Sequence, residues 1–446
     1  MAKLELLIEN IDMPEVNNME IKRVRIKGFK NITDVDITFD NLTALVGLNG
    51  YGKSNTMNAI DFGIDFIKYP PRIKTKTMSA KQNIPVLRGC PGRNFELEVE
   101  FIATSNQKEY FVEYGYEFSW KKHNASAQII KEYLKIKANE KGQKYNSYII
   151  RDDTCAKIRR STTGRCDAVI KIENNNLVIN KLTAFDDLFY IDIVNQVNQI
   201  SFYIERHLDA SPSYNPDPFI VKGFEELELN GIQNIPRAIY FLKKEHNDKF
   251  KLLINSFREL FPNIVGIDVS EIKLNGKPSI KLSDDAPFVF SDSIYSMVVT
   301  DSLLVQPINF ENLSDGAKRI FLMLTYAVIA DVKGLSIIAI EEPENSIHPR
   351  LLQNYLDILS QLLNTCKIVF TSHSPYIIQY LNPRNIYIGM SSVDGSVDFR
   401  RISSTKVTAM IKDAETYDKS LGDYIFNLLS SSDSEESLSE YVEAKR

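Results

Sequence analysis

The chain has 446 residues, of which 43% are hydrophobic and 25% are charged, and its formal net charge is -5. These proportions are ordinary for a globular protein, and the length exceeds that of one compact domain, so we expect a core domain with an inserted or appended lobe. The negative net charge argues against a globally basic nucleic-acid binder but is compatible with a local basic face.

Membrane and secretion signals are not apparent in the sequence. No uninterrupted apolar stretch approaches the roughly 20 residues that a membrane-spanning helix needs. The first 20 residues lack the basic-then-apolar layout of a secretory signal. The four cysteines, Cys90, Cys155, Cys166 and Cys366, show neither metal-ligand nor redox spacing. We therefore expect a soluble, cytoplasmic protein with reduced thiols and no membrane partner.

The predicted elements begin with short strands that lead into a glycine-rich loop. Residues 21–26 alternate in polarity, and residues 42–46 form a buried apolar run. After the loop, residues 54–68 keep apolar side chains at helical spacing, and Pro70-Pro71 ends that helix. We expect residues 1–80 to form the first part of a core domain.

An antiparallel region is predicted next, over residues 81–180. Residues 95–101 alternate cleanly between apolar and polar side chains, and residues 110–118 follow after a polar turn. Residues 120–180 are strongly polar and locally basic. The alternating strands and the polar turn between them predict an antiparallel β subdomain.

The remaining chain divides into three parts. Residues 181–304 predict a mostly helical insert, with two strand-like pieces around Asn275-Gly276. Residues 305–395 predict a second part of the core, in the order helix, strand, helix, strand. Residues 396–446 form a C-terminal segment, and its serine- and acid-rich stretch at 430–440 predicts a mobile tail.

The most specific motif is a phosphate-binding loop. Residues 47–54 fit Gly-x-x-x-x-Gly-Lys-Ser, between a buried strand and a helix. The glycines let backbone N–H groups curl around phosphates, and the helix N-terminus adds partial positive charge. We expect Lys53 to reach the β and γ phosphates of ATP and the Ser54 hydroxyl to bind Mg²⁺. The predicted ATP-binding residues are Asn49, Gly50, Tyr51, Gly52, Lys53, Ser54 and Asn55.

Acidic residues end a second buried strand. Residues 336–340 are almost entirely apolar and lead into Glu341-Glu342, and ligands bind at this carboxyl edge of parallel sheets. We assign Glu341 to Mg²⁺ and Glu342 to the attacking water. A further buried strand delivers His373 to the same edge, where it can hydrogen-bond the γ-phosphate. Acids at the end of a strand are often merely solvated, and a lone histidine is more often structural. Both assignments therefore depend on the fact that the strand carrying His373 follows the acidic strand.

A short motif precedes the acidic strand. The stretch Asn312-Leu313-Ser314-Asp315-Gly316 opens a long apolar helix that Ser314 can cap. Leu-Ser-x-Gly at this place closely resembles the signature motif of ATP-binding-cassette (ABC) ATPases. The resemblance implies that Ser314, Gly316 and the helix N-terminus complete the ATP site of a second chain. With one phosphate loop and one signature in the sequence, it implies a homodimer with two shared ATP sites and leaves higher assembly open.

Residues around the acidic strand extend the resemblance. The stretch Ile-Glu-Glu-Pro-Glu-Asn-Ser-Ile-His-Pro at 340–349 looks like the acidic-strand motif of the RecF/OLD-like AAA ATPases, and residues 26–31 look like their first strand and turn, near the nucleotide base. This implies an α/β fold: an ABC-type P-loop NTPase core with an antiparallel β subdomain and an inserted α/β lobe. It places His348 in the segment that communicates across the dimer. Gln82 is the candidate for the glutamine loop.

The spacing of the motifs argues against two kinds of relative. About 260 residues separate Ser54 from Ser314 and no long heptad run is present, so the coiled-coil arms of chromosome-maintenance and break-repair ATPases do not fit. About 70 residues follow His373, too few for the nuclease domain of OLD-like nucleases. We therefore expect an ATPase without a nuclease domain of its own, whose working chemistry belongs to a partner.

Among families of this size, the chain resembles the ATPase subunits of bacterial anti-phage systems. The Septu ATPase works with an HNH nuclease, and the PARIS ATPase restrains a toprim nuclease. This resemblance implies a defence ATPase that controls an effector nuclease, with residues 428–446 as a candidate docking tail.

The alternative is a RecF-like DNA-repair clamp that binds DNA through a basic stretch at residues 121–160. A solvated strand and loop face would carry the same residues. The basic residues in question include Lys135, Lys137, Lys141, Lys144, Arg151, Lys157, Arg159 and Arg160.

Overall fold

A computed structural model describes residues 19–85, 92–121, 126–206, 214, 218–221, 235–274, 288–391, 395–431 and 434–444. Its main element is a sheet of fourteen strands in the order β10-β16-β17-β3-β18-β19-β2-β1-β4-β5-β6-β7-β8-β9. In chain order these strands are β1 (Glu20–Phe29), β2 (Ile32–Thr38), β3 (Leu42–Val46), β4 (Phe95–Ser105), β5 (Lys108–Ser119), β6 (Gln128–Ala138), β7 (Asn146–Arg151), β8 (Ala156–Arg159), β9 (Cys166–Val169), β10 (Phe202–Glu205), β16 (Ile337–Glu341), β17 (Lys367–Ser372), β18 (Ile386–Ser391) and β19 (Val397–Arg401).

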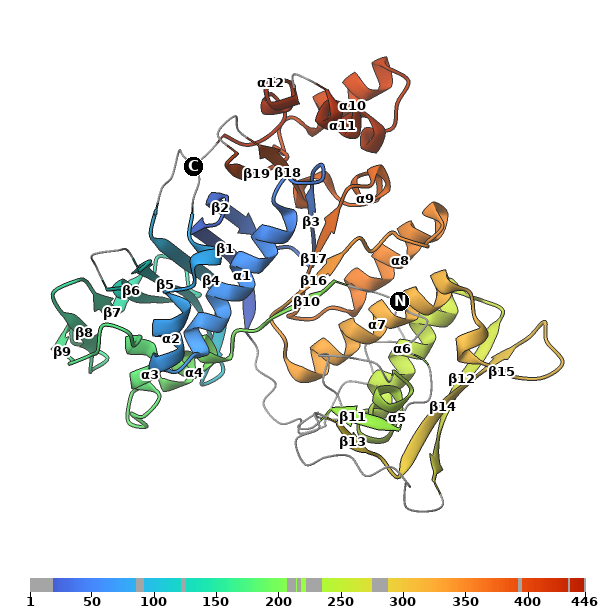
Figure 1. The fold of residues 1–446 in the computed structure, drawn as a ribbon, viewed down its shortest axis with the longest axis horizontal. Coiled ribbons are helices and arrows are strands. Elements are labelled where there is room, and N and C mark those ends of the chain that lie inside the picture. Colours follow the sequence, from blue (N-terminus) through green and yellow to red (C-terminus); the bar gives the residue numbers. More distant parts are fainter. Residues whose placement is uncertain are drawn as a thin grey trace.

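Twelve helices accompany the strands of the described chain, and three single-turn 3-10 helices lie between them (Figure 1). Within the described ranges, every helix is too short or too polar to cross a bilayer. The helices are α1 (Lys53–Lys68), α2 (Pro71–Thr77), α3 (Val178–Leu182), α4 (Ile191–Gln199), α5 (Ile235–Glu245), α6 (Asn247–Leu260), α7 (Asp315–Lys333), α8 (Pro349–Leu362), α9 (Pro375–Tyr380), α10 (Val407–Thr416), α11 (Leu421–Ser430) and α12 (Ser434–Ser439).

One end of the large sheet is parallel and aligns three strand ends. Strands β10, β16, β17, β3 and β18 pair in parallel as neighbours. The register places Glu341 opposite Thr371, and Ser372 opposite Val46. The carboxyl ends of β16, β17 and β3 therefore lie level at one edge, which is where ligands bind in sheets of this kind.

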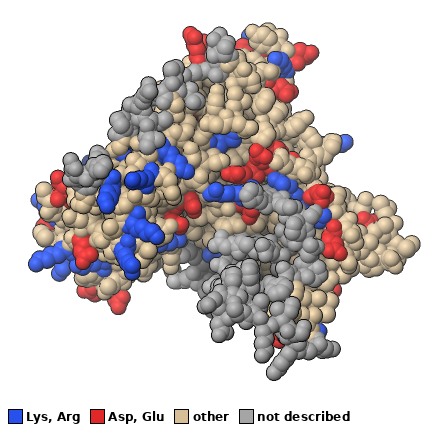
Figure 2. Space-filling model, viewed as in Figure 1, with Lys and Arg blue, Asp and Glu red and all other residues tan. Residues whose placement is uncertain are grey.

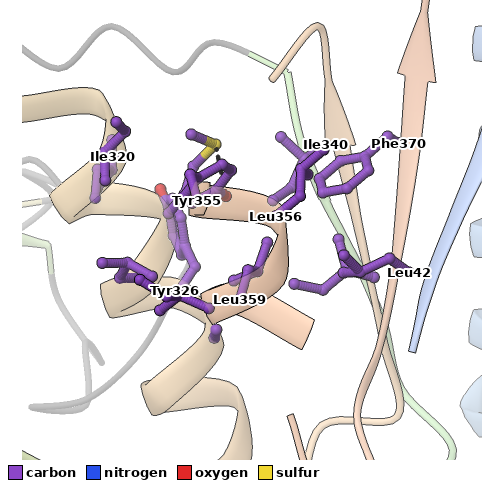
Figure 3. Close-up of a cluster of buried hydrophobic side chains, with 14 of the residues drawn as sticks. Leu42, Ile320, Tyr326, Ile340, Tyr355, Leu356, Leu359 and Phe370 are labelled. Carbon is purple, nitrogen blue, oxygen red and sulfur yellow. Dashed lines mark hydrogen bonds between the residues drawn. The ribbon is translucent and has the colours of Figure 1, made fainter. Parts of the chain in front are cut away.

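Successive residues of the parallel strands enter two different cores, one on each face of the sheet. Ile340 of β16 and Phe370 of β17 pack with α7 and α8 (Figure 3), whereas Ile337 and Ala339 lie in the core that holds α1. These strands read as continuous apolar runs because alternate side chains are buried on opposite faces. On the α7–α8 side, the Tyr355 hydroxyl donates to the sulfur of Met323.

The antiparallel strands expected over residues 81–180 are β4 to β9. They continue the core sheet, because β4 pairs with β1 and the later strands follow as a meander. Asn106 and Gln107 form the tight turn between β4 and β5, and both have positive φ angles, as the favoured two-residue hairpin turns require. The mixed α/β fold with a large sheet confirms the predicted fold class.

The insert expected at residues 181–304 contains helices and strands. α5 and α6 pack on a small antiparallel sheet ordered β12-β14-β15, and β11 pairs with β13. The strand-like pieces predicted around Asn275-Gly276 correspond to β12 and β14, although residues 275 and 276 lie outside the described residues. The strands are β11 (Phe219–Val221), β12 (Ile264–Lys273), β13 (Phe288–Phe290), β14 (Ser293–Asp301) and β15 (Ile308–Asn309).

The stretch at residues 430–440, for which the sequence predicts a mobile tail, contains the short helix α12, and its mobility stays a prediction. α11 and α12 pack together, and Leu429, Leu438, Tyr441 and Val442 are buried. Val442 also forms a β-bridge with Ile402. Apolar residues placed among the serines and acids form one buried face, which average composition does not reveal.

Asp61 is a largely buried carboxyl on α1. The pKa of Asp61 is raised to about 6, chiefly by burial and also by the nearby Asp65 carboxylate, while Arg206 acts in the opposite direction. The folded protein therefore binds this proton more tightly than the unfolded chain does. Between a pH near the unfolded pKa of 3.8 and a pH of about 6, ionisation of Asp61 lowers stability as pH rises.

We predict that Asp61→Asn stabilises the protein more at about pH 7.5 than at about pH 5, because the charge it removes is present only at the higher pH. Allowing for solvent screening, the difference in the free energy of unfolding is on the order of 1 kcal/mol. Urea titrations at both pH values measure it, with Asp357→Asn on the exposed side of α8 as the control. An equal effect at both pH values would contradict this assignment.

Candidate functional site

The phosphate loop connects the end of β3 to the start of α1. Gly50 and Gly52 have φ angles of 84° and 74°, in the left-handed region that glycine adopts without steric cost. A Cβ at Gly52 would also lie 2.9 Å from a methyl group of Val397 in β19. Gly50 faces open space, since a Cβ there would meet no atom within 4 Å. The loop therefore has the required backbone form and an accessible cradle.

Lys53 lies inside this loop. Its ammonium donates to the carbonyl oxygens of Gly47, at 2.6 Å, and Leu48, at 3.2 Å. Burial lowers the pKa of Lys53, and the nearby carboxylates of Glu342 and Glu341 act in the opposite direction. Lys53 of the phosphate loop and the two acids at the end of β16, Glu341 and Glu342, are thus close enough to interact electrostatically.

Asn55 ties the loop to the first hairpin. Its Nδ2 donates to Asn31 Oδ1 at 2.8 Å, and Lys30 Nζ donates to Asn55 Oδ1 at 3.4 Å. The turn at residues 30–31 therefore lies against the first turn of α1, and its place near the nucleotide base stays a prediction. Gln82 is exposed on a single 3-10 turn whose Asn83 carbonyl accepts from the Lys30 N–H. Its role as the glutamine loop stays a prediction.

The acidic strand delivers Glu342 beside His373. Glu342 Oε1 lies 3.0 Å from His373 Nδ1, which is close enough for an ion pair when the histidine is protonated. The two groups are not aligned as a hydrogen bond, and this nitrogen has no hydrogen-bond partner among the described residues. Asn345 Nδ2 donates to the other carboxylate oxygen of Glu342 at 2.8 Å. The structure therefore brings the predicted water-orienting acid and the predicted phosphate sensor together.

A third carboxylate at this edge, Glu344, was missed by sequence reasoning. Ser374 N–H donates to Ser372 Oγ at 2.9 Å, and Ser372 Oγ donates to Glu344 Oε1. Glu344 Oε2 is buried and has no hydrogen-bond partner among the described residues. Burial raises the pKa of Glu344. The only sequence signal was a further acid two positions after Glu342, across Pro343.

The signature motif forms the start of α7. Ser314 caps this helix and accepts from the Ala317 N–H at 3.3 Å. Gly316 packs so closely on the loop after β16 that a Cβ would lie 2.6 Å from the Ser346 carbonyl oxygen. The helix start is thus joined to the loop that follows the acidic pair. The contribution of Ser314 and Gly316 to a second chain's site stays a prediction.

His348 ends the loop that begins at Glu342. It is exposed, it caps α8, and its Nδ1 accepts from the Arg350 N–H at 3.3 Å. The predicted communication segment is therefore a short loop between the acidic strand and α8.

The donor atoms at this edge fit Mg²⁺. Ser54 supplies a hydroxyl from the first turn of α1, and Glu341 supplies a carboxylate from the end of β16. Within the described parts of the chain, no group of three or more His, Cys, Asp or Glu residues is arranged to hold a metal. Mg²⁺ suits such a sparse set, because it takes its other oxygens from phosphates and water. When bound, it would neutralise charge on those phosphates.

Comparison with known proteins identifies the family of the ATPase core. The profile of the AAA ATPase domain family matches residues 19–378. Comparison with curated proteins finds no match.

Three solved structures of SMC heads align with most of the chain at low identity. They are an Smc head bound to the C-terminal winged-helix domain of ScpA (15% identity, TM-score 0.45, 87% of this chain and 99% of that one), the SMC head domain from Thermotoga maritima (13%, 0.43, 86% and 99%) and an Smc head with an extended coiled coil bound to the C-terminal domain of ScpA from Pyrococcus furiosus (13%, 0.45, 89% and 100%). The assignment of the core rests on the family profile, the phosphate loop and the strand order.

We predict that Glu342→Gln binds ATP but hydrolyses it at least about a hundredfold more slowly, because the amide cannot accept a proton from water. Phosphate release and retention of labelled ATP measure the two steps. Glu415→Gln, on the exposed face of α10, is the matched control. Equal turnover by Glu342→Gln and wild type would overturn the assignment of this residue.

Proposed function

Because the chain belongs to the AAA ATPase domain family, we propose that it binds and hydrolyses ATP as a homodimer whose two nucleotide sites are each shared between two chains. One observation carries the catalytic part of this proposal. The strand register brings the phosphate loop, the acidic pair and His373 to a single edge of the sheet. A phosphate-binding cation, an acid able to orient water and a histidine able to contact phosphate are the parts that phosphoryl transfer to water needs.

The chemistry assigns a role to each group. The loop N–H groups and Lys53 hold the phosphates, and the phosphates replace the Gly47 and Leu48 carbonyls as partners of the ammonium. Glu342 orients the attacking water and receives its proton, while Asn345 fixes one oxygen of that carboxylate. His373 lies beside Glu342 and donates to the γ-phosphate. Loss of this phosphate on hydrolysis therefore removes a hydrogen bond from the residue next to Glu342.

The dimer follows from the signature motif. Ser314 and Gly316 lie at the start of α7, and the partial positive charge of a helix N-terminus suits an anion. We assign them to the γ-phosphate held by the other chain. ATP then stabilises the closed dimer because its phosphate is bound from both sides, and hydrolysis removes that link.

The proposed role of the dimer is to control a partner nuclease in anti-phage defence. Support for this comes from the motif set, which resembles that of the defence ATPases. In the described part of the C-terminal segment the apolar side chains Leu438, Tyr441 and Val442 are buried, so a partner that docks there would contact its exposed polar residues.

The alternative, a DNA-binding clamp, has a weaker basis in the structure than in the sequence. Figure 2 shows lysines and arginines over the arm of strands β4 to β9, with acids among them. Arg151 is buried opposite Glu132, and Lys135 pairs with Glu113 at 2.9 Å. Of the eight basic residues named for this stretch, Lys141, Lys144 and Arg160 are exposed, and Lys121 and Lys131 of the same stretch are exposed as well.

Shared sites predict that two inactive variants restore each other. Lys53→Ala removes ATP binding from its own chain, and Ser314→Arg blocks the site of the opposite chain. A mixed dimer keeps one intact site, made by the Lys53 of one chain and the Ser314 of the other. We expect ATP turnover from the mixture to be well above that of either variant alone, and below half of wild type. No recovery at any mixing ratio would refute shared sites.

The nuclease-control role predicts that the purified chain alone does not cut DNA with Mg²⁺ or Mn²⁺. Cleavage should appear only with a nuclease encoded beside it, and should change between wild type and Glu342→Gln. Metal-dependent cleavage by the pure chain would refute this role. Salt-sensitive DNA binding that is lost in Lys141→Gln/Lys144→Gln/Arg160→Gln would favour the clamp instead.

A further inference from the structure

Arg319 joins the signature helix to the backbone of the candidate catalytic acid. It lies one helical turn after Gly316 on α7, and its Nη2 donates to the Glu342 carbonyl oxygen at 2.7 Å. Burial lowers the pKa of Arg319, and among the neighbouring charges the Glu344 carboxylate most strongly favours the charged form. A hydrogen bond from a charged, partly buried donor is stronger than one between neutral groups. The bond from Arg319 therefore holds the Glu342 backbone strongly against α7.

The backbone of Glu342 needs such support. Its φ angle is 50°, a left-handed conformation that costs a residue with a Cβ about 1 kcal/mol or more. Three hydrogen bonds hold it: the Glu342 N–H donates to the Thr371 carbonyl at 2.8 Å, and the Glu342 carbonyl accepts from the Asn345 N–H at 3.2 Å and from Arg319. The direction of the Glu342 side chain, toward His373, depends on this backbone conformation.

A second contact couples the same two elements. Gly316 leaves no room for a Cβ beside the Ser346 carbonyl, and Ser346 also has a left-handed φ angle of 64°. The start of α7 therefore touches the loop after β16 at Ser346 and, one turn later, at Glu342. A shift of α7 cannot leave this loop unchanged, because close-packed elements move together.

We propose that Arg319 is a positioning residue that holds Glu342 of its own chain and transmits to it the engagement of α7 with the partner's nucleotide. This inference rests on the proposed shared sites. In each chain, α7 contacts one nucleotide through Ser314 and positions the acid that acts on the other. Hydrolysis in one site is thereby tied to occupancy of the second, which is a coupling between two distinct sites.

The first test is the kinetics of Arg319→Gln in the full-length protein. We expect kcat to fall on the order of tenfold to a hundredfold with KM unchanged, because ATP binding is intact and only the acid is misplaced. ATP-dependent dimerisation, measured by light scattering, should persist. Arg319→Lys keeps the charge and one donor, so it should recover part of the loss. Added to Glu342→Gln, the Arg319→Gln change should cause little further loss.

Lys249→Met provides a matched control. It removes an ion pair to Asp331 at the other end of α7, away from the loop, so it should leave kcat and KM close to wild type. A rise in KM without a fall in kcat for Arg319→Gln would overturn the proposal, as would equal losses for Arg319→Gln and Lys249→Met.

Heterodimers decide which site Arg319 serves. With Lys53→Ala in one chain, the single working site uses the phosphate loop and Glu342 of the other chain. Arg319→Gln should lower turnover when placed in that other chain, and should have little effect in the Lys53→Ala chain. The reverse pattern would mean that Arg319 shapes the signature for the partner's phosphate, and would overturn the proposal; so would an equal effect in both chains.

Failure of the proposed function gives a different result. If sites are not shared, the Lys53→Ala and Ser314→Arg mixture shows no recovery, whatever residue occupies position 319. The homodimer kinetics still test the local role of Arg319 in that case, because they depend only on Glu342 of the same chain.

Discussion

The parallel register of β16, β17 and β3 is the constraint on which the candidate site depends. It sets Glu341 opposite Thr371, and Ser372 opposite Val46, so that three loops leave the sheet at the same level. A slip of one residue would turn each side chain of a strand to the opposite face and exchange the two cores. The hydrophobic packing on both faces of the sheet therefore also fixes the position of the polar groups at its edge.

Charged groups of both signs lie close together at this edge. Glu341, Glu342 and Glu344 interact electrostatically with the half-buried Lys53, and Arg319 and His373 lie beside the same acids. Glu344 also leaves a buried oxygen without a partner among the described residues, which costs about 1–3 kcal/mol in an ordinary interior. Such groups concentrate at functional sites, where a ligand or a moving element supplies the missing interaction. The buried, unpaired oxygen of Glu344 lowers stability, and its place at this edge is typical of a functional site.

The loop after β16 connects this edge to the proposed dimer interface. It contains two non-glycine residues with positive φ, Glu342 and Ser346, and both touch α7. Backbone strain of this kind persists only where neighbouring elements hold it, and here the neighbour is the helix that the proposed function assigns to the partner's nucleotide. The same contacts that stabilise the loop can therefore report the state of the second site.

The sequence by itself determined the elements whose signals are local. The glycines and Lys53 predict the phosphate loop because strand, turn and helix N-terminus follow one another directly, and alternating or continuous apolar runs predict the strands. Only the tertiary structure decided which distant groups meet. Arg151, predicted within a basic surface, is buried because its cross-strand neighbour is Glu132; Arg319 reaches Glu342 across the start of the acidic loop. Burial and pairing depend on non-local packing, which no local pattern of residues specifies.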